Sequence, residues 1–585
     1  MISRLLSYLA RRSMRVFREP KARPLVAQGI ALHAAGDAAG ARGALEQALA
    51  IDPDNAGAHH WLGVVLAGEG AAQAGAEHLE RAILLDPKLF EAYNDLGYLY
   101  FLQGNHPRAI TLYRRALAIA PEPAQARHIL GLLLKDTGDR DEGLVHLREA
   151  NRLAPDDGAL LRSLVVTLVE VGLFDEAVAV AGRAVARNAG SAEAQRCLGY
   201  VFQNLHEPAN ALKCYEEAMR LGSDDADFHN DRAVVMQDLG RLPEAFECYE
   251  RALARRPDFP QSVFHRGLAR LLTGDYVRGW ADYEARHAVP GLLPVRPASF
   301  PRWDGAPLAG RTLLVYGEQG LGDEIMFASC LPQAMAAGGP CIIECAPKLR
   351  GLLARSFPEA TVYPAVPDRR MPPVIAARPI DFEIAMGSLP RLFRRSLGEF
   401  PRHEGYLSAD PARVARWRER LARLGDGLKI GISWRGGVHK TRRPLRSLTL
   451  GHWLPILRVP GARFVSLQYT AGAEAEAAQV AKEHGVLVTH WPDAIADYED
   501  TAALVAALDL VVSVCTAVIH LGGALGRPVW VMAPYSAEWR YGASGDAMPW
   551  YPSVRLFRQP AFGQWEPVIS SVAGELERRA VASGG

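Results

Sequence analysis

The sequence lacks several features that would assign it to a simple class. Its seven cysteines form no regular framework, and no His or Cys cluster with zinc spacing accompanies Cys341 and Cys345 in the apolar run CIIEC. No apolar stretch of about 18 residues is present, so we expect no membrane-spanning helix. We therefore expect buried thiols and a reducing compartment, the cytoplasm.

An excess of either charge is also missing, since 66 basic residues face 65 acidic ones. A dedicated nucleic-acid binder usually has a basic excess, so we expect no nucleic acid among the partners. The basic N-terminal segment, residues 1–21, carries arginines that interrupt the apolar core that a signal peptide needs: Arg4, Arg11, Arg12, Arg15 and Arg18. We interpret this segment as an amphipathic helix that can contact a membrane surface, or as a solvated leader helix.

What the first half has is a period of 34 residues. Prolines recur at this spacing or a multiple of it, at Pro53, Pro87, Pro121, Pro155 and Pro257. A glycine series in the same register has His206 in its one gap: Gly36, Gly70, Gly104, Gly138, Gly172, Gly240 and Gly274. An alanine series has no gap: Ala48, Ala82, Ala116, Ala150, Ala184, Ala218 and Ala252. Three coincident series exclude chance.

These residue types suit a helix–turn–helix unit, because glycine breaks the chain between helices, alanine allows close packing, and proline cannot continue the second helix. The pattern resembles the tetratricopeptide repeat, with units starting near residues 22, 56, 90, 124, 158, 192 and 226. An eighth unit, from about 260, departs into GDYVRGWADYEARH. The resemblance predicts an α-solenoid over residues 22–290, a right-handed superhelix with a concave groove.

The resemblance also places the fifth residue of each unit on the concave side. These residues are His60, Asn94, His128, Arg162, Arg196, Asn230 and Phe264. A polar, partly cationic ladder suits an extended peptide, whose backbone needs hydrogen-bond partners along its length. We expect a protein acceptor in this groove; alternatively, the ladder is simply solvated.

From about residue 291 the period stops, and β-rich runs alternate with helical segments. The runs are TLLVY, CIIEC and FEIAM, and later KIGISW, FVSLQ, LVVSV and PVWVM. This alternation predicts parallel sheets covered on both faces. A break near residues 401–411 divides them into two Rossmann-like halves, residues 291–408 and 409–585. Ligands of such sheets bind beyond the carboxyl ends of the strands.

Three loops carry the candidate chemistry. The first has Gly317, Gly320 and Gly322 before a helix that begins near Asp323. Such glycines let backbone approach a ligand, but they also suit a tight structural turn. The second loop follows the strand that ends at Cys515. There the amides of Thr516, Ala517 and Val518 would face a diphosphate at a helix N-terminus.

The third loop follows KIGISW and is strongly basic. Its cations, Arg435, Lys440, Arg442, Arg443 and Arg446, suit phosphate binding, with a solvated basic loop as the alternative.

Together these motifs resemble the family 9, heptosyltransferase-like glycosyltransferases, especially bacterial proteins that fuse such a domain to tetratricopeptide repeats. The layout is also similar to that of the eukaryotic O-linked N-acetylglucosamine transferases. The resemblance implies a GT-B fold, an inverting reaction, a nucleotide-sugar donor, and no cofactor or metal. Residues 291–585 contain no Asp-x-Asp, which agrees with a metal-free mechanism.

The resemblance assigns roles to single residues. Asp323 aligns with the general base, with a helix N-cap as its alternative. Lys440 and Arg446 look like the cations that neutralise the leaving diphosphate, and Thr516 and His520 match a Ser/Thr-Gly-x-x-His segment at the phosphates. His520 is alternatively a core histidine.

Two departures from the family pattern stand in the 515–520 loop. Cys515 replaces an acidic residue and Ala517 replaces a glycine, which puts donor choice or catalysis in doubt. The cluster AEWRYGASGDAMPWYPSVRLFRQ contains residues that can border the sugar or be structural: Trp539, Arg540, Trp550 and Tyr551. Gln468 and Asp500 are weaker candidates for base or ribose contacts.

The leading hypothesis is transfer of a sugar to Ser or Thr of a protein recruited by the repeats, with flagellin as the acceptor that the resemblance suggests. One alternative is a transferase acting on lipopolysaccharide or capsule. The other is a non-catalytic repeat adaptor whose transferase domain is degenerate.

Overall fold

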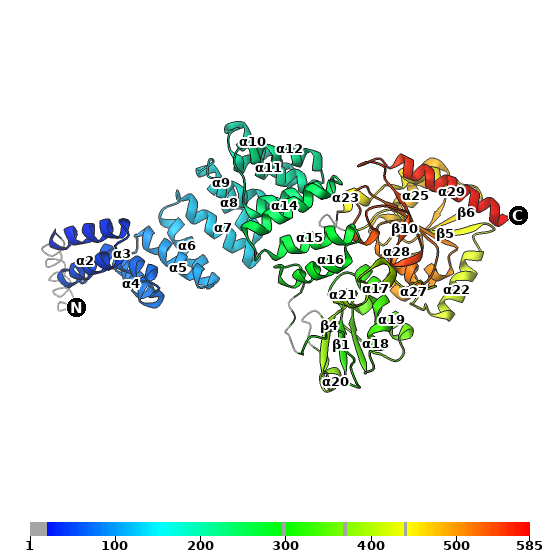
Figure 1. Ribbon diagram of the computed structural model, residues 1–585. Coiled ribbons are helices and arrows are strands. Elements are labelled where there is room, and N and C mark those ends of the chain that lie inside the picture. The colour runs from blue at the N-terminus through cyan, green and yellow to red at the C-terminus, as the bar shows by residue number, and fades with distance from the viewer. Residues whose placement is uncertain (1–19, 295, 297–299, 367–370, 438–441, 585) are drawn as a thin grey trace, which may run out of the picture. The chain divides into compact units, whose positions relative to one another are not determined.

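The structure is a computed structural model that describes residues 20–294, 296, 300–366, 371–437 and 442–584. The basic segment predicted over residues 1–21 lies outside this range except for its last two positions. The chain forms two compact units. The first comprises the described residues up to Leu205 together with Lys213–Ser223, and the second comprises His206–Leu212 and the described residues from Asp224 onward. The first unit is helical, and the second adds two sheets to the last repeat helices (Figure 1).

Helices that pack in sequential pairs build the repeats, such as α3 on α4 in the first unit and α13 on α14 in the second. Residues 20–34 are helical. The following helices are α2 (Ala38–Ile51), α3 (Ala56–Gly68), α4 (Ala72–Leu85), α5 (Phe90–Leu102), α6 (His106–Ile119), α7 (Ala124–Thr137), α8 (Arg140–Leu153), α9 (Gly158–Glu170), α10 (Phe174–Arg187), α11 (Ala192–Asn204), α12 (Pro208–Arg220), α13 (Ala226–Asp238), α14 (Leu242–Arg255), α15 (Pro260–Leu272) and α16 (Tyr276–Tyr283). The predicted helix–turn–helix repeats are confirmed.

The periodic residues have the predicted roles. Every glycine of the series adopts a positive φ between paired helices, and His206, which fills the gap, does the same with φ 61°. The alanines are buried. A further glycine in several units was missed: a Cβ at Gly63 would lie 2.7 Å from Leu79 Cγ, and one at Gly199 would lie 2.6 Å from Tyr215 Cε1. These glycines let the paired helices approach closely.

The first sheet of the second unit is parallel, with strand order β3-β2-β1-β4. Its strands are β1 (Leu313–Tyr316), β2 (Cys341–Cys345), β3 (Thr361–Pro364) and β4 (Phe382–Ala385). The second sheet has the order β10-β11-β9-β8-β5-β6-β7, in which β10 pairs antiparallel to β11 and the other pairs are parallel. Its strands are β5 (Leu428–Ser433), β6 (Ala462–Ser466), β7 (Val488–Thr489), β8 (Leu510–Val514), β9 (Val529–Ala533), β10 (Ala547–Met548) and β11 (Tyr551–Arg558).

This topology positions the candidate loops. In each sheet the strand order reverses at one point. In the first sheet β2 pairs with one side of β1 and β4 with the other, and in the second sheet β6 pairs with one side of β5 and β8 with the other. In open α/β sheets ligands bind beyond the carboxyl ends of the strands at such points. The loops at 317–323, 435–446 and 515–520 follow β1, β5 and β8. All seven strands predicted from the sequence form, whereas β3, β7, β10 and β11 were not predicted.

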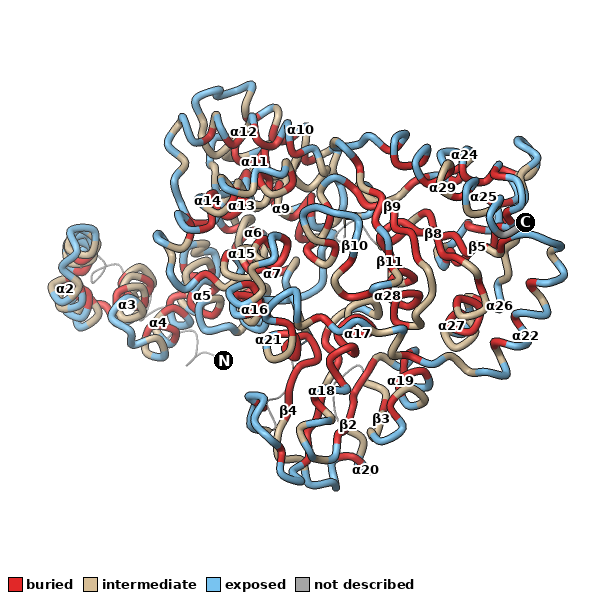
Figure 2. Tube along the Cα trace, turned by 45° about the vertical axis from the view of Figure 1, so that its right-hand side comes forward, coloured by how far each residue is buried: buried red, intermediate tan, exposed pale blue. Residues whose placement is uncertain are grey.

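Helices cover both sheets, and the central strands are buried, as Figure 2 shows for β5, β8 and β9. The α/β helices are α17 (Leu321–Phe327), α18 (Leu331–Met335), α19 (Arg350–Ser356), α20 (Pro373–Ala376), α21 (Pro390–Phe393), α22 (Pro411–Ala422), α23 (Arg443–Arg446), α24 (Leu454–Leu457), α25 (Ala473–His484), α26 (Pro492–Ala496), α27 (Tyr498–Ala507), α28 (Ala517–Ala524) and α29 (Glu566–Gly584). Short 3-10 helices include η1 (Glu284–Ala288) and η8 (Trp539–Tyr541). Within the described residues, no helix has the length and apolar character needed to cross a membrane.

The last repeat shares its core with the α/β region. Trp280 and Tyr283 of α16 are buried in one apolar cluster with Phe327, Trp539 and Trp550. The Trp280 ring meets that of Trp539 edge-on at 5.4 Å. Although the composition changes at residue 291, the compact unit therefore already includes the repeat helices α13–α16.

Candidate active site

The three candidate loops lie against one another in the second unit. Helix α17 packs on α28 so closely that a Cβ at Gly322 would lie 3.0 Å from His520 Cδ2 and 3.5 Å from Ala517 Cα. A Cβ at Gly436 would lie 2.5 Å from Thr516 Cγ2. Lys440 of the basic loop lies outside the described residues. The described parts of all three loops thus meet at one place.

The glycines of the first loop have a packing reason. None of Gly317, Gly320 and Gly322 has a positive φ, so no turn requires them. A Cβ at Gly317 would lie 2.5 Å from the Glu324 carboxyl carbon, and Gly322 faces α28. Only Gly320 has open space, since the nearest atom to a Cβ there would be Asp323 Oδ2 at 3.6 Å. Gly322 therefore has a role in packing, and its expected contact with the donor stays a prediction.

Asp323 is held by an arginine from a distant segment. Helix α17 begins at Leu321 with Gly320 as its N-cap and no side-chain cap, so Asp323 is not the cap. Its Oδ1 accepts from Arg540 Nε at 2.8 Å and also from Arg540 Nη2. No described residue hydrogen-bonds to its second oxygen, Oδ2. With 19% of the side chain exposed, one carboxylate oxygen is anchored and the other remains available to a ligand.

Arg540 begins a series of alternating charges. Its Nη1 donates to Glu538 Oε2 at 2.7 Å, and Glu538 Oε1 accepts from Arg446 Nη1 at 2.9 Å. Burial acts to lower the pKa of Arg540, but the carboxylates of Asp323 and Glu538 outweigh it and raise that pKa. Arg540 therefore stays charged and keeps Asp323 oriented, while Arg446 is linked to the same series.

Burial keeps two other motif residues neutral. His520 is buried, with Nδ1 3.2 Å from the Tyr551 hydroxyl, and burial followed by Arg540 lowers the pKa of the ring to about 3. Burial followed by Glu538 raises the pKa of Cys515 to about 12, so this thiol cannot supply the negative charge of the acidic residue it replaces. His520 is a neutral core histidine packed against α17.

Groups that can bind an anion surround the β5–β8 junction. Thr516 is the N-cap of α28, and among the described residues no side chain caps this first turn, which leaves the amides of Ala517 and Val518 for a ligand. An open pocket of about 430 Å³ lies beside the loop that follows β5. Its lining is Arg435, Arg443, Pro444, Ser447, Leu448, Thr449 and His452. Cationic and hydroxyl groups of this kind suit a phosphate-bearing ligand.

Two of the weaker candidates, Gln468 and Trp539, have structural roles. Gln468 is buried, and its Oε1 accepts from the amides of Trp434 and Arg435 at 3.0 and 2.9 Å, so it fixes the start of the basic loop. Trp539 is packed among aromatic rings, including Trp280. Both residues thus have partners inside the protein, and their expected contact with a sugar or base stays a prediction.

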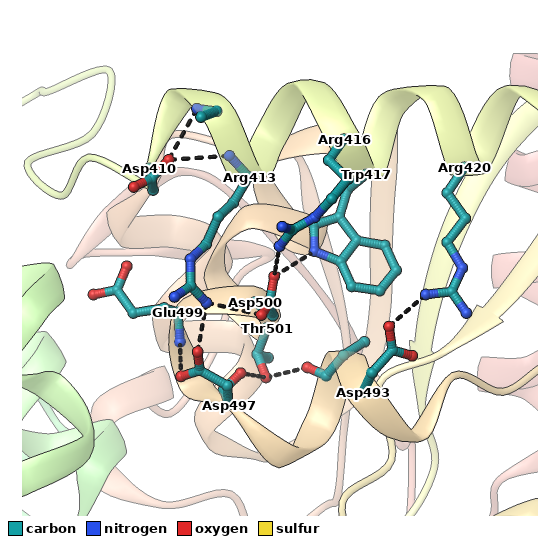
Figure 3. Close-up of polar contacts among 12 residues, drawn as sticks. Asp410, Arg413, Arg416, Trp417, Arg420, Asp493, Asp497, Glu499, Asp500 and Thr501 are labelled. Carbon is teal, nitrogen blue, oxygen red and sulfur yellow. Dashed lines mark hydrogen bonds and ion pairs between the residues drawn. The ribbon is translucent and has the colours of Figure 1, made fainter.

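Asp500 does not join the site. Its carboxylate binds α22 through Arg413 Nη1 at 2.8 Å, Arg416 Nη2 at 2.7 Å and Trp417 Nε1 at 3.0 Å. Figure 3 shows it within a cluster of ion pairs between α22 and the α26–α27 segment. This carboxylate anchors α22 instead of binding ribose.

Several of the predicted groove residues bind a neighbouring repeat. His60 Nε2 lies 2.7 Å from Asp95 Oδ2, His128 Nε2 lies 2.7 Å from Ser163 Oγ, and His265 Nδ1 lies 3.1 Å from Asn230 Oδ1. Each pair joins the fifth residue of one unit to the sixth residue of the next. Arg162 pairs with Glu193, Asn94 donates to Asp95, and Arg196 is buried. Four of the fifth-position residues thus form inter-repeat contacts, His60, His128, Arg162 and Asn230, and their partner positions were missed from the sequence.

The end of the eighth repeat also reaches the site. Arg286 is fully buried and donates from Nη2 to Glu318 Oε1 at 2.7 Å and to Ser388 Oγ at 2.8 Å. These partners follow β1 and β4. The Tyr283 hydroxyl accepts from Gln319 Nε2 at 2.7 Å. The only sequence signal for these contacts was the departure of this unit into GWADYEARH.

Comparison with known proteins agrees with the repeat assignment. Tetratricopeptide-repeat family models match residues 29–70, 90–123 and 235–291. Protein FlbA of Caulobacter vibrioides is 34% identical over 420 residues, which cover 68% of this chain and 70% of FlbA. The chain belongs to the FlbA family. Because neither the repeats nor the α/β region alone is this long, the match to FlbA includes parts of both.

Solved structures match the chain over shorter parts. A tetratricopeptide repeat protein from Parabacteroides merdae is 15% identical and has a TM-score of 0.34, covering 40% of this chain and 93% of its own. YrrB, described as a tetratricopeptide-repeat protein with an unusual peptide-binding site, is 19% identical and has a TM-score of 0.28, covering 30% and 92%. The repeat models and the similarity to FlbA indicate a role in repeat-mediated protein interaction.

Proposed function

We propose that the second unit is an inverting, metal-independent nucleotide-sugar transferase of the GT-B type, which glycosylates a hydroxyl of a polypeptide recruited by the repeats. The observation that carries this proposal is the placement of Asp323. Its Oδ1 is anchored by Arg540, and its free Oδ2 lies where the loops after β1, β5 and β8 meet. The strand orders of the two sheets support two Rossmann-like halves.

The proposed reaction is a single displacement. Asp323 Oδ2 takes the proton of an acceptor hydroxyl, and the acceptor oxygen attacks the anomeric carbon from the side opposite the diphosphate. A new C–O bond forms as the bond to the diphosphate oxygen breaks, so the configuration inverts and a nucleoside diphosphate leaves. A general base of this kind contributes about 10²–10⁴-fold to the rate.

Negative charge develops on the leaving diphosphate. The free amides of Ala517 and Val518 and the dipole of α28 supply fixed positive potential there. Arg446 supplies a cation, although Glu538 shares its charge through the 2.9 Å contact. Lys440 would add a second cation from the basic loop. Loss of one such contact typically raises the barrier by about 3 kcal/mol.

The acceptor is the less constrained substrate. Repeats suit a polypeptide, so Ser or Thr of a protein is proposed, and the family resemblance suggests flagellin. A glycolipid acceptor is the competing choice, which intact-mass analysis of surface proteins and glycolipids from a deletion strain would reveal. The neutral thiol of Cys515 favours the other alternative, a non-catalytic adaptor.

The test uses Asp323→Asn in the full chain. With a panel of nucleotide sugars and a cell lysate, mass spectrometry should show transfer by the wild type and a loss of at least about 100-fold in the variant. Nucleoside diphosphate affinity, measured by calorimetry, should change less than about twofold, because an uncharged isostere leaves the phosphate contacts in place.

The matched control is Asp304→Asn, an exposed position in the same half of the α/β region. It should behave as the wild type. Full activity of Asp323→Asn would remove Asp323 as the base. A wild-type chain that binds none of the nucleotides or nucleotide sugars would favour the adaptor.

A further inference from the structure

Asp238, the last residue of repeat helix α13, binds the segment that carries the phosphate-site arginines. Its Oδ1 accepts from Arg442 Nη2 at 2.5 Å and from Ser536 Oγ at 3.0 Å. Arg442 Nη2 also donates to Ser536 Oγ at 2.5 Å. Asp238 is buried, with 8% of the residue exposed. A carboxylate from the repeats therefore lies inside the structure around the β5 and β9 loops.

Arg442 needs such an anchor because of its backbone. It has φ 62°, a left-handed conformation that is unfavourable for a residue with a Cβ and persists where the surroundings fix it. Among the described residues, Asp238 and Ser536 are its side-chain partners. Arg442 is also the N-cap of α23, which ends at Arg446. The anchor on Arg442 therefore sets the position of Arg446, four residues later.

The same repeat turn makes a second contact. Gly240, between α13 and α14, lies so close to Tyr535 that a Cβ there would be 2.8 Å from the Tyr535 hydroxyl oxygen. Tyr535 and Ser536 precede Glu538, the partner of Arg446. The turn formed by residues 238–240 thus holds both segments that meet at Arg446.

We infer that Asp238 is a positioning residue for donor binding, through which the repeats fix the Arg442–Arg446 segment where a nucleoside diphosphate binds. The inference rests on the proposed transferase function. It gives α13–α14 a role beyond acceptor recruitment, because the repeat turn becomes part of the support of the phosphate site.

The test compares Asp238→Asn with Asp227→Asn, a control on the same helix whose partner is Arg256, between α14 and α15. Calorimetry with UDP, ADP, GDP and CDP identifies the nucleoside diphosphate that the wild type binds best. Asp238→Asn should raise its Kd about tenfold, because a charged anchor is lost, and Asp227→Asn should change it less than about twofold.

A double-variant cycle separates positioning from general destabilisation. In an Arg442→Ala background, Asp238→Asn should have little further effect on the Kd, because the Arg442 side chain is already gone and an asparagine oxygen can still accept from Ser536. A full additional effect would show that Asp238 does not act through Arg442 and would overturn the inference.

A second measurement does not depend on nucleotide. Trypsin should cleave the Arg442–Arg443 bond several-fold faster in Asp238→Asn than in the wild type or Asp227→Asn at equal thermal stability. Unchanged cleavage would overturn the anchor itself. If the wild type binds a nucleoside diphosphate and Asp238→Asn binds it equally well, the inference fails while the transferase proposal stands. If the wild type binds none of the four, the transferase proposal fails and with it the role in donor binding.

Discussion

His520 occupies a motif position where a protonated imidazole would face phosphate, yet its burial lowers the ring pKa to about 3. Arg540 and Arg446 act in the same direction, while Glu538 opposes them. At neutral pH the positive charge near the β8 loop therefore comes from arginines. The choice between a ligand and a core histidine depended on burial, which a motif alone does not reveal.

The buried ring predicts a pH dependence of stability. The unfolded chain binds a proton at His520 below about pH 6.5, whereas the native ring stays neutral down to about pH 3, so acid favours unfolding. This residue should remove about 2 kcal/mol of stability between pH 7 and pH 5. His520→Gln should flatten the fall in unfolding free energy over this window, measured by urea denaturation at each pH. An equal slope in both proteins would show that His520 titrates normally.

Some residues of the site could be predicted from the sequence and others could not. Asp323, Arg446 and Arg540 were singled out and do belong to one charged series. Glu538, which joins them, lies in the same cluster as Arg540 but was missed, because its contact with Arg446 depends on the fold. Asp500 was chosen for its residue type, but its partners on α22 could not be known without the fold.

At the level of elements, the contact between α17 and α28 connects the two sheets. Gly322→Ala should destabilise the protein by about 1–3 kcal/mol, because the new methyl would lie only 3.0 Å from Cδ2 of the buried His520 ring. Gly574→Ala is the matched control: nothing lies within 4 Å of a Cβ there, and alanine favours helix α29. The measurement is the thermal unfolding midpoint of each variant compared with that of the wild type. A Gly322→Ala protein as stable as the control would mean that the two helices can separate freely.

Elements with strong periodicity were predictable and short ones were not. The 34-residue series located the repeat helices, and even the gap at His206 proved to be a left-handed residue. The missed strands β7 and β10 have two residues each, too few for an alternating pattern. Strand order was also beyond the sequence, since it follows from packing between segments far apart in the chain.

Over the whole molecule, the repeats and the α/β region do not separate at the change in composition. A fragment that starts at residue 291 loses Trp280, Tyr283 and Arg286, all at most 1% exposed, and uncovers the core around Trp539. We expect this fragment to aggregate or to lack a cooperative transition. A fragment that starts at residue 206 should unfold cooperatively, as followed by circular dichroism and tryptophan emission. Cooperative unfolding of the shorter fragment would show that the last repeat is dispensable.

The contacts between successive repeats differ in chemistry from one junction to the next. One pairs a histidine with a carboxylate, another a histidine with a hydroxyl, and a third a histidine with an amide. Stacked units of similar shape risk joining out of order, because any apolar face can cover any other. Because the polar pairs differ between junctions, stacking two units that are not neighbours in the chain would leave a polar side chain without its hydrogen-bond partner. The polar pair at each junction thereby favours the native order of the units, and a protein with shuffled repeats would not form these pairs.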